Sequence, residues 1–375
     1  MKRLLARRLV QALNRSCCRR QSQMTSTNRV VFSGIQPTGD LHLGNYFGAV
    51  REWLRLQQDP FTQTYICIVD LHAVTQRQYP DELKQGIVQM AASLLAAGLD
   101  PQAVCLYQQS RVPEHGQLSW ILGSTCLTVA HLQRQAQYKD RAAEYRDVMV
   151  PLGILLYPCL QAADILLYRS THVPVGEDQE QHLQVARHVA RTFNEYYQNE
   201  IFPEPEMLKS NAPRVMSIRN PEKKMSKSDP DSKARICITD RPDEVRFKVR
   251  KALTDFVSEV FHEPELRPAV SNLMTLHSLV TGKSIDEITM ESIDLNTAQY
   301  KERLAEDVVQ FVGPMYDRYR DLLNDPGYVL DVLEYGREQA QEAATQTMRQ
   351  VRKIMGMALY DEDSLILHKD AVLEE

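Results

Sequence analysis

Residues 29–45, RVVFSGIQPTGDLHLGN, decide the fold of this 375-residue chain. The apolar run Val30–Phe32 predicts a short buried strand, and Gly34–Gly39 with its proline predicts a tight loop. His42–Asn45 then begin an amphipathic helix that we expect to reach about Gln58. Because free backbone N–H groups and the positive end of the helix dipole point at such a loop, this stretch predicts a phosphate cradle.

A second stretch, the basic loop Lys223–Ser228 (KKMSKS), lies between Arg214 and Asp231. The flanking Asn-Pro and Asp-Pro pairs exclude a long helix there. Three lysines in a loop suit a polyphosphate, for which catalysis is mostly positioning and charge neutralisation. The same composition is also typical of a solvated surface loop, so the lysines by themselves leave both interpretations open.

Between these stretches, strand patterns alternate with helix patterns, which predicts a doubly wound parallel sheet. The expected strands are 64–70, 103–108 and 172–176, and the expected helices are 80–98, 114–142, 152–168 and 177–198. Ligands of such sheets bind beyond the C-terminal strand ends, where Gly34, Asp70 and Ser110 fall. After Asp231 the apolar spacing becomes helical over 242–253, 269–281, 297–323 and 326–356. We therefore expect an α/β, Rossmann-like catalytic domain followed by an α-helical domain.

The N-terminus is basic and has helical leucine spacing, with no Asp or Glu before Asp40. These features predict a mitochondrial transit peptide over residues 1–24 and a location in the mitochondrial matrix; a basic arm that binds RNA is the alternative. Removing these residues deletes seven Lys and Arg and moves the net charge from −5 to −12. A chain this acidic needs a local basic patch to bind nucleic acid. No apolar run is long enough to span a membrane.

The seven cysteines are scattered, with no CxxC pair and no histidine at metal-ligand spacing. They predict reduced thiols and no metal site. In the late helices, two basic clusters are candidates for RNA phosphate contacts or for solvated helix faces. They are Arg246, Lys248, Arg250 and Lys251, and Arg349, Arg352 and Lys353.

The pair HLGN and KMSKS, about 180 residues apart, resembles the two signatures of class I aminoacyl-tRNA synthetases. The strings GIQPTG, LQAADILLY and VPVGEDQ are similar to the tryptophan branch of that family, and the resemblance covers about residues 29–356. The family's second signature histidine is Asn45 here, a departure that the tryptophan branch shares.

The resemblance implies that ATP is a substrate, with Mg²⁺ on its phosphates. His42, Asn45, Lys224 and Lys227 would act at the phosphates. Further ATP contacts would come from Gln36, Pro37, Thr38, Gly44, Arg141, Gly176, Glu177, Asp178, Val215, Met225, Ser226 and Ser228. Arg141 stands where the family has a lysine, with Lys139 nearby, so this one assignment stays open.

The resemblance also implies a tryptophan pocket in which Asp164 accepts the indole N–H. From the residues themselves, a single carboxylate in the apolar stretch 152–168 is costly unless it has a partner; a surface or capping Asp is the alternative. Other expected pocket residues are Phe32, His72, Gln137, Tyr157, Gln161, Val173, Val175 and Gln179. Gln161 stands where many relatives carry Met, which leaves the pocket's contacts there open.

Together these features predict ATP-dependent ligation of L-tryptophan to mitochondrial tRNA(Trp) through an adenylate, by a homodimer. The expected division is 1–24 leader, 25–231 catalytic domain, 232–360 tRNA-binding helical domain and 361–375 acidic tail. Three alternatives remain: a tyrosine–tRNA ligase, a small-molecule nucleotidyltransferase and a non-enzymatic tRNA-binding protein. The GIQPTG and VPVGEDQ strings disfavour the first, the long helical segment after KMSKS disfavours the second, and intact Lys224, Lys227, Asp164 and Asp178 disfavour the third.

Overall fold

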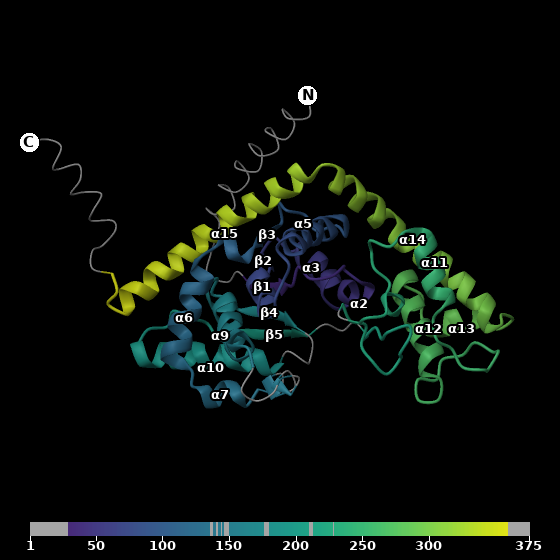
Figure 1. Cartoon of the computed structure of the whole chain (residues 1–375), viewed down its shortest axis with the longest axis horizontal. Coiled ribbons are helices and arrows are strands. Elements are labelled where there is room, and N and C mark those ends of the chain that lie inside the picture. The colour runs from purple at the N-terminus through teal and green to yellow at the C-terminus, as the bar shows by residue number, and fades with distance from the viewer. Residues whose placement is uncertain are drawn as a thin grey trace, which may run out of the picture.

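The computed structural model describes residues 29–135, 138–139, 142–143, 145, 150–175, 180–209, 213–227 and 229–358. Its sheet has five parallel strands in the order β3-β2-β1-β4-β5 (Figure 1). They are β1 (Arg29–Ile35), β2 (Thr62–Ile68), β3 (Val104–Gln108), β4 (His172–Val175) and β5 (Glu206–Lys209). The order reverses between β1 and β4, which is where doubly wound sheets bind ligands. The predicted fold class is confirmed.

Helices flank this sheet and then form the C-terminal part. Around the sheet lie α2 (Leu43–Asn45), the π-helix η1 (Tyr46–Val50), α3 (Arg51–Leu56), α4 (Asp70–Ala73), α5 (Pro80–Ala96), the 3₁₀-helix η2 (Gln109–Arg111), α6 (Glu114–Cys126), α7 (Val129–Gln133), α9 (Leu152–Leu166) and α10 (Glu180–Tyr197). After them come the 3₁₀-helix η4 (Ser232–Ala234), α11 (Pro242–Arg250), α12 (Pro268–Thr281), α13 (Ile285–Glu291), α14 (Thr297–Asn324) and α15 (Pro326–Ile354).

The structure corrects the helix predicted over 114–142. α6 ends at Cys126, and Leu127 and Thr128 are extended. Thr128 then caps α7, because its side-chain oxygen accepts a hydrogen bond from the backbone N–H of His131. A threonine hydroxyl that bonds to a nearby backbone N–H favours a helix start over a helix interior. The sequence reading also missed β5 and α13, which are short elements of four and seven residues.

The two faces of the sheet carry two hydrophobic clusters. Alternate side chains of a strand point to opposite faces, so Ile66 and Ile68 belong to one cluster while Tyr65 and Cys67 belong to the other. The first cluster packs under α3 and α5, and the second under α6, α9 and α10 (Figure 1). The site at the strand ends is therefore supported by packed side chains on both faces.

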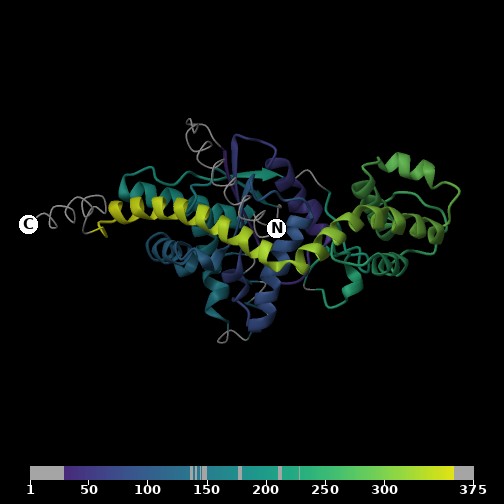
Figure 2. The ribbon, with the colours of Figure 1, turned by 90° about the horizontal axis from the view of Figure 1, so that it is seen from above.

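The long helix α15 covers β3, the edge strand. Gly336 makes this possible, because a Cβ there would lie 1.9 Å from the backbone oxygen of Leu106. The thiol of Cys105 also donates a hydrogen bond to the oxygen of Gly336 at 3.2 Å. α14 and α15 form an inverted V that joins the helical part to the sheet (Figure 1), and seen from above the helical part extends to one side (Figure 2). An edge strand covered in this way cannot pair with another chain.

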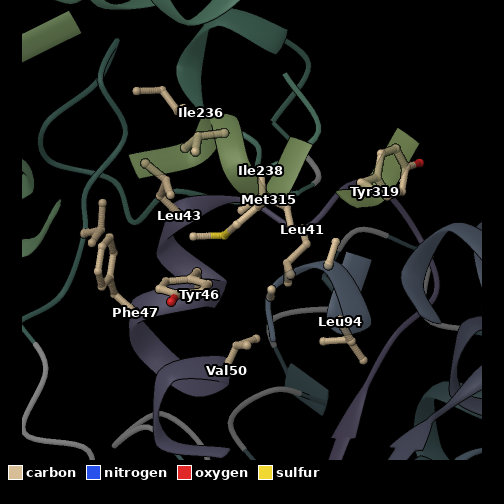
Figure 3. Close-up of a cluster of buried hydrophobic side chains, with 14 of the residues drawn as sticks. Leu41, Leu43, Tyr46, Phe47, Val50, Leu94, Ile236, Ile238, Met315 and Tyr319 are labelled. Atoms are coloured by element: carbon tan, nitrogen blue, oxygen red, sulfur yellow. The ribbon is translucent and has the colours of Figure 1, made fainter. Parts of the chain in front are cut away.

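One hydrophobic core runs through both parts of the chain. Leu41 and Leu43 pack with Ile236 and Ile238 and reach Met315 of α14 (Figure 3). These residues lie on both sides of the boundary expected at 231/232, which stays a prediction. Throughout the described ranges, no helix combines the length and the apolar composition that a membrane span requires.

The described cysteines are Cys67, Cys105, Cys126, Cys159 and Cys237, and all five are buried free thiols. Burial raises the pKa of Cys159 to about 11. Burial, together with the negative charge of Asp240, raises the pKa of Cys237 to about 12. The thiols of Cys159 and Cys237 therefore stay protonated at neutral pH.

Candidate active site

His42 begins the helix that follows the predicted phosphate loop. It is the N-cap of α2, where its Nδ1 accepts a hydrogen bond from the backbone N–H of Asn45 at 3.2 Å. Burial, with the positive charges of Lys227, Arg235 and Lys224, lowers the pKa of His42 to about 3. The ring is therefore neutral, and because Nδ1 accepts, Nε2 carries the proton. His42 is thus a neutral N–H donor at the N-terminus of a helix.

Asn45 adds a polar group on the same turn. Its Oδ1 is buried and has no hydrogen-bond partner among the described residues. The nitrogen and oxygen of a side-chain amide exchange places when the group rotates by half a turn, so Asn45 can present either a donor or an acceptor. A buried polar atom without a partner is costly, and a bound ligand at this turn would relieve that cost.

The chain after the lysine loop pairs directly with the HLGN turn. The backbone N–H of Leu43 donates to the oxygen of Ile236 at 2.8 Å, and that of Ile238 donates to Leu41 at 2.9 Å. His42 and Cys237 are the residue pair of an isolated antiparallel β-bridge, and these two hydrogen bonds flank that pair. Two segments almost 200 residues apart in sequence are therefore held together by backbone hydrogen bonds.

The lysine loop is itself attached to the preceding segment. The N–H of Met225 donates to the oxygen of Val215 at 3.2 Å, and the N–H of Ser217 donates to that of Lys223 at 2.8 Å. The side chains of Met225 and Val215 are buried in the core. Contact of these two residues with a nucleotide would therefore go through their backbones. Lys224, in contrast, is exposed.

Lys227 reaches across to the phosphate loop. Its Nζ donates a hydrogen bond to the backbone oxygen of Gln36 at 3.1 Å. Its Cβ lies 3.4 Å from the place that a Cβ on Gly39 would take. Burial lowers the pKa of Lys227 to about 8, against the opposing effect of Asp40. Lys227, His42 and the 36–39 loop thus surround one place, with positive charge and N–H groups suited to phosphate oxygens.

The predicted loop 36–38 is supported from behind by α5. A Cβ on Gly86 would lie 2.4 Å from the backbone oxygen of Pro37, so the helix touches the loop backbone. Pro37 is buried, Thr38 is half-buried and Gln36 is exposed. The loop that is expected to lie along ATP therefore rests on a rigid helix.

Asp164 lies at the C-terminal end of the sheet, on α9. It is 1% exposed, and three side chains surround its carboxylate. Gln109 Nε2 and His115 Nδ1 lie 2.7 and 2.6 Å from Oδ1, and His72 Nε2 lies 2.7 Å from Oδ2. Burial alone would raise the pKa of Asp164, but the hydrogen bonds from His115 and His72 outweigh it and hold that pKa below its ordinary value. Asp164 is therefore an ionised acceptor.

This arrangement revises one part of the sequence reading. The sequence predicts a carboxylate whose partner is a ligand, and the surface or capping alternative is excluded because Asp164 is buried. The protein itself supplies partners through His72, Gln109 and His115, so Asp164 stays hydrogen-bonded whatever side chain binds. His115 and Gln109 were missed. Ser110 was identified because it follows the C-terminal end of a strand, and the same rule applies to Gln109. No pattern in the sequence identifies His115, because the packing of α6 on α9 brings it to Asp164.

Aromatic rings line the region beside Asp164. The Phe32 ring stacks on Tyr168 with 5.9 Å between centroids, and Tyr65 stacks on the same ring at 4.3 Å. Val173 is buried in the same cluster. Tyr157 and Gln161 are half-buried on α9, at helical spacing before Asp164. The surroundings of Asp164 are therefore largely aromatic and apolar.

Asp70, which follows strand β2, is hydrogen-bonded to residues at the end of β3. Its carboxylate accepts hydrogen bonds from the backbone N–H of Ser110 at 2.9 Å, from the Ser110 hydroxyl at 2.5 Å and from Gln108 Nε2 at 2.7 Å. Asp70 and Ser110 lie at the C-terminal strand ends, as predicted, and they are hydrogen-bonded to each other. These bonds fix η2, which carries Gln109.

Some residues that are predicted to contact ATP or tryptophan lie outside the part of the chain that the structure describes. They are Gln137, Arg141, Gly176, Glu177, Asp178, Gln179 and Ser228. For Val175, the structure describes the backbone in β4. Ser226 is described and is half-buried. Gly44 lies close to the His42 ring, since a Cβ built on Gly44 would be 3.0 Å from that ring.

The first basic cluster favours the solvated-face alternative. Arg246 pairs with Glu306 at 2.7 Å, Arg250 pairs with Glu302 at 2.7 Å, and Lys248 pairs with Asp240 at 2.6 Å. Lys251 is exposed. In the second cluster, Arg352 donates to Gln117. Three of the four cations in the first cluster therefore carry an acidic neighbour, which weakens their attraction to phosphate.

Among the described residues, no group of three or more His, Cys, Asp or Glu side chains could hold a metal ion.

The chain is similar to known proteins in both sequence and structure. Residues 24–313 match the family model for class I tRNA synthetases (W and Y). A tryptophan–tRNA ligase of Caldanaerobacter subterraneus is 43% identical over 88% of this chain and 99% of its own length. The mitochondrial tryptophan–tRNA ligase of Saccharomyces cerevisiae is 38% identical over 94% and 98%. The structure of tryptophanyl-tRNA synthetase from Campylobacter jejuni complexed with ADP and tryptophan superposes with a TM-score of 0.76 at 31% identity, over 87% and 99% of the two chains.

Proposed function

The chain belongs to the class I tRNA synthetases of the tryptophan and tyrosine family, and from this premise we infer that it is an enzyme that ligates L-tryptophan to tRNA(Trp) with ATP as a substrate. The amino acid's carboxylate oxygen attacks the α-phosphorus, and the bond to the bridging oxygen of pyrophosphate breaks. A ribose hydroxyl of the tRNA 3′ end then attacks the activated carbonyl and releases AMP. A carboxylate is already a nucleophile, so the first step needs no general base.

One observation carries the chemistry: the two signature stretches meet. Lys227 Nζ bonds to the oxygen of Gln36, and the chain after the lysine loop pairs with the HLGN turn. In the proposed mechanism, Lys224 and Lys227 neutralise charge that moves onto the leaving pyrophosphate. His42 donates through Nε2–H and Asn45 through its amide. Mg²⁺ would be held by phosphate oxygens, since the described side chains offer no cluster of ligands.

Asp164 supports the choice of tryptophan. Indole has one N–H donor and no acceptor, and an ionised carboxylate accepts only. The rings of Phe32 and Tyr168 provide an apolar wall beside it. We propose that the indole N–H binds Asp164, that Gln179 and Gln137 contact the rest of the amino acid, and that the helical part after Asp231 binds the tRNA.

The mitochondrial role is a separate proposal. It is supported by the basic, acid-free residues 1–24 and by the mitochondrial relative from yeast. A fluorescent fusion of the full chain should locate to the mitochondrial matrix, and the same fusion starting at Thr25 should not. If both fusions stay in the cytosol, the proposal fails.

The homodimer is also proposed. The helices α6 and α7 both pack on α9, and these three helices carry four exposed apolar side chains, Trp120, Val129, Leu152 and Leu156. Trp120 is 77% exposed, and exposed apolar groups of this kind mark protein interfaces. Sedimentation should show a dimer that Trp120→Glu converts to a monomer. The matched control is Tyr196→Glu on α10, where the exposed ring of Tyr196 (78%) lies off these three helices.

The function is tested by ATP–pyrophosphate exchange with each of the twenty amino acids, on protein starting near Thr25. Exchange with tryptophan, abolished by Lys227→Met, is the expected result. Exchange with tyrosine instead would keep the reaction and overturn the substrate. No exchange with any amino acid, while tRNA still binds, would support the non-enzymatic alternative.

A further inference from the structure

The two oxygens of the Asp164 carboxylate have different surroundings. Oδ1 receives both Gln109 and His115, and each of those residues is 0% exposed. Oδ2 receives His72, which is 9% exposed. Both partners of Oδ1 are therefore fully buried, whereas His72, the partner of Oδ2, is slightly exposed.

Counting lone pairs separates the two oxygens further. Each carboxylate oxygen can accept about two hydrogen bonds. Within the described residues, Oδ1 already accepts two and Oδ2 accepts one. A single incoming N–H therefore has its place on Oδ2, beside the ring N–H of His72.

Both groups that hold Oδ1 are themselves fixed in orientation. The backbone N–H of Leu71 donates to Gln109 Oε1 at 3.1 Å, so the Gln109 amide must turn its N–H₂ toward Asp164. His115 Nδ1–H donates to Asp164, and the Tyr168 and Tyr107 hydroxyls lie 2.9 and 3.1 Å from its Nε2. Neither donor can turn away without breaking a second buried hydrogen bond, which is costly.

We propose that Gln109 and His115 are positioning residues for substrate choice: they tie down Oδ1 of Asp164 and thereby present Oδ2 to the indole N–H of tryptophan. The proposal rests on the proposed function, in which Asp164 receives that N–H. It predicts that losing either donor weakens recognition of the N–H specifically and leaves recognition of the rest of the ring system in place.

The test compares tryptophan with its benzothiophene isostere, in which sulfur replaces the indole N–H. Amino-acid-dependent pyrophosphate exchange gives kcat/KM for both, and their ratio reports the N–H contact. His115→Leu should lower this ratio by about 10- to 100-fold, the effect of one hydrogen bond to a charged group. The loss should lie in kcat/KM for tryptophan, with the isostere changed much less. His115→Asn keeps a donor near the Nδ1 position and should restore most of the ratio.

Gln109→Met provides an independent variant if His115→Leu does not fold, and it should lower the ratio in the same way. The matched control is His277→Leu in the helical part. His277 is also buried, 1% exposed, with Nε2 2.7 Å from Asp307 Oδ2, and its loss should leave the ratio unchanged.

Two failures can be told apart. If the unmodified enzyme shows no tryptophan-dependent exchange, the proposed function is wrong. If it does, but His115→Leu and Gln109→Met lower kcat/KM for both amino acids equally, the two residues act through general structure and the inference is overturned. An unchanged ratio in folded variants overturns it as well.

Discussion

At the scale of single residues, this site uses burial to set proton positions. His42 is neutral because burial and neighbouring cations lower its pKa to about 3, while its Nδ1 serves as a helix cap. Lys227 keeps its charge at neutral pH with a pKa of about 8. One ring therefore performs two tasks, a structural one through Nδ1 and a proposed chemical one through Nε2–H.

Two substitutions separate the tasks of His42. His42→Asn keeps an acceptor for the N–H of Asn45 but loses the Nε2–H, so kcat for adenylate formation should fall by about 100-fold with little change in stability. His42→Ala also loses the cap, and its free energy of unfolding should be lower by a further ~1 kcal/mol. Stopped-flow kinetics and urea unfolding measure the two effects. If His42→Asn retains full kcat, the ring is a cap and has no role in the reaction.

The pKa of Lys227 predicts a limb in the pH profile. Burial lowers that pKa to about 8, so the lysine is charged below pH 8 and loses its proton above it. kcat/KM for ATP, which reports the free enzyme, should therefore fall as the pH rises through 8. An arginine stays charged to above pH 12, so the Lys227→Arg profile should lack this limb whatever its absolute rate. A limb that survives in Lys227→Arg belongs to another group.

At the scale of elements, α15 depends on one glycine. Its first half packs with the core under α5 and its second half with the core under α6 and α10. Gly336, between them, lies against the backbone of Leu106. The helix can therefore cross the edge of the sheet only where it lacks a side chain.

Alanine at two helical glycines tests this contact. Gly336→Ala places a Cβ 1.9 Å from the Leu106 oxygen, and should lower the free energy of unfolding by about 3 kcal/mol. Gly313→Ala on α14, where nothing lies within 4 Å, should raise it by about 0.5–1 kcal/mol because alanine favours helices. Urea unfolding measures both. Equal effects would mean that helix propensity outweighs packing at Gly336.

The elements also show how far the sequence could predict the structure. The doubly wound sheet, its strands and the long helices followed from apolar spacing, because burial imposes that spacing. The break at Thr128 was missed, since a capping hydroxyl competes with a continuous helical pattern. β5 was missed because its sequence, EMLK, has only two apolar residues between charged ones and so shows no apolar run. His115 was missed because its role arises from packing between helices that are distant in sequence.

At the scale of the whole molecule, the two parts share a core. Ile236 and Ile238 follow the lysine loop and pack on Leu41 and Leu43 of the HLGN segment (Figure 3). Backbone hydrogen bonds join the same two segments. Separating the helical part from the sheet would therefore expose apolar surface and break backbone pairing at the site itself.

A shared core predicts cooperative unfolding. Trp53, 1% exposed, and Trp120 on α6 both report on the sheet part by fluorescence, while far-UV circular dichroism is dominated by the helices. The two signals should change together in one urea transition. Repeating the experiment at several protein concentrations separates dissociation of a dimer from unfolding. Loss of the helical signal before the tryptophan fluorescence changes would show that the parts unfold independently.

The burial of Cys237 has a practical consequence. Only a thiolate reacts readily with alkylating reagents, and this thiol is protonated and lies in the bridge with His42. Labelling of Cys237 then requires that the two segments separate first. The alkylation rate of Cys237 in the native enzyme therefore measures how often the molecule opens at its nucleotide loop. A lower rate in the presence of ATP would measure how strongly the substrate stabilises the closed form.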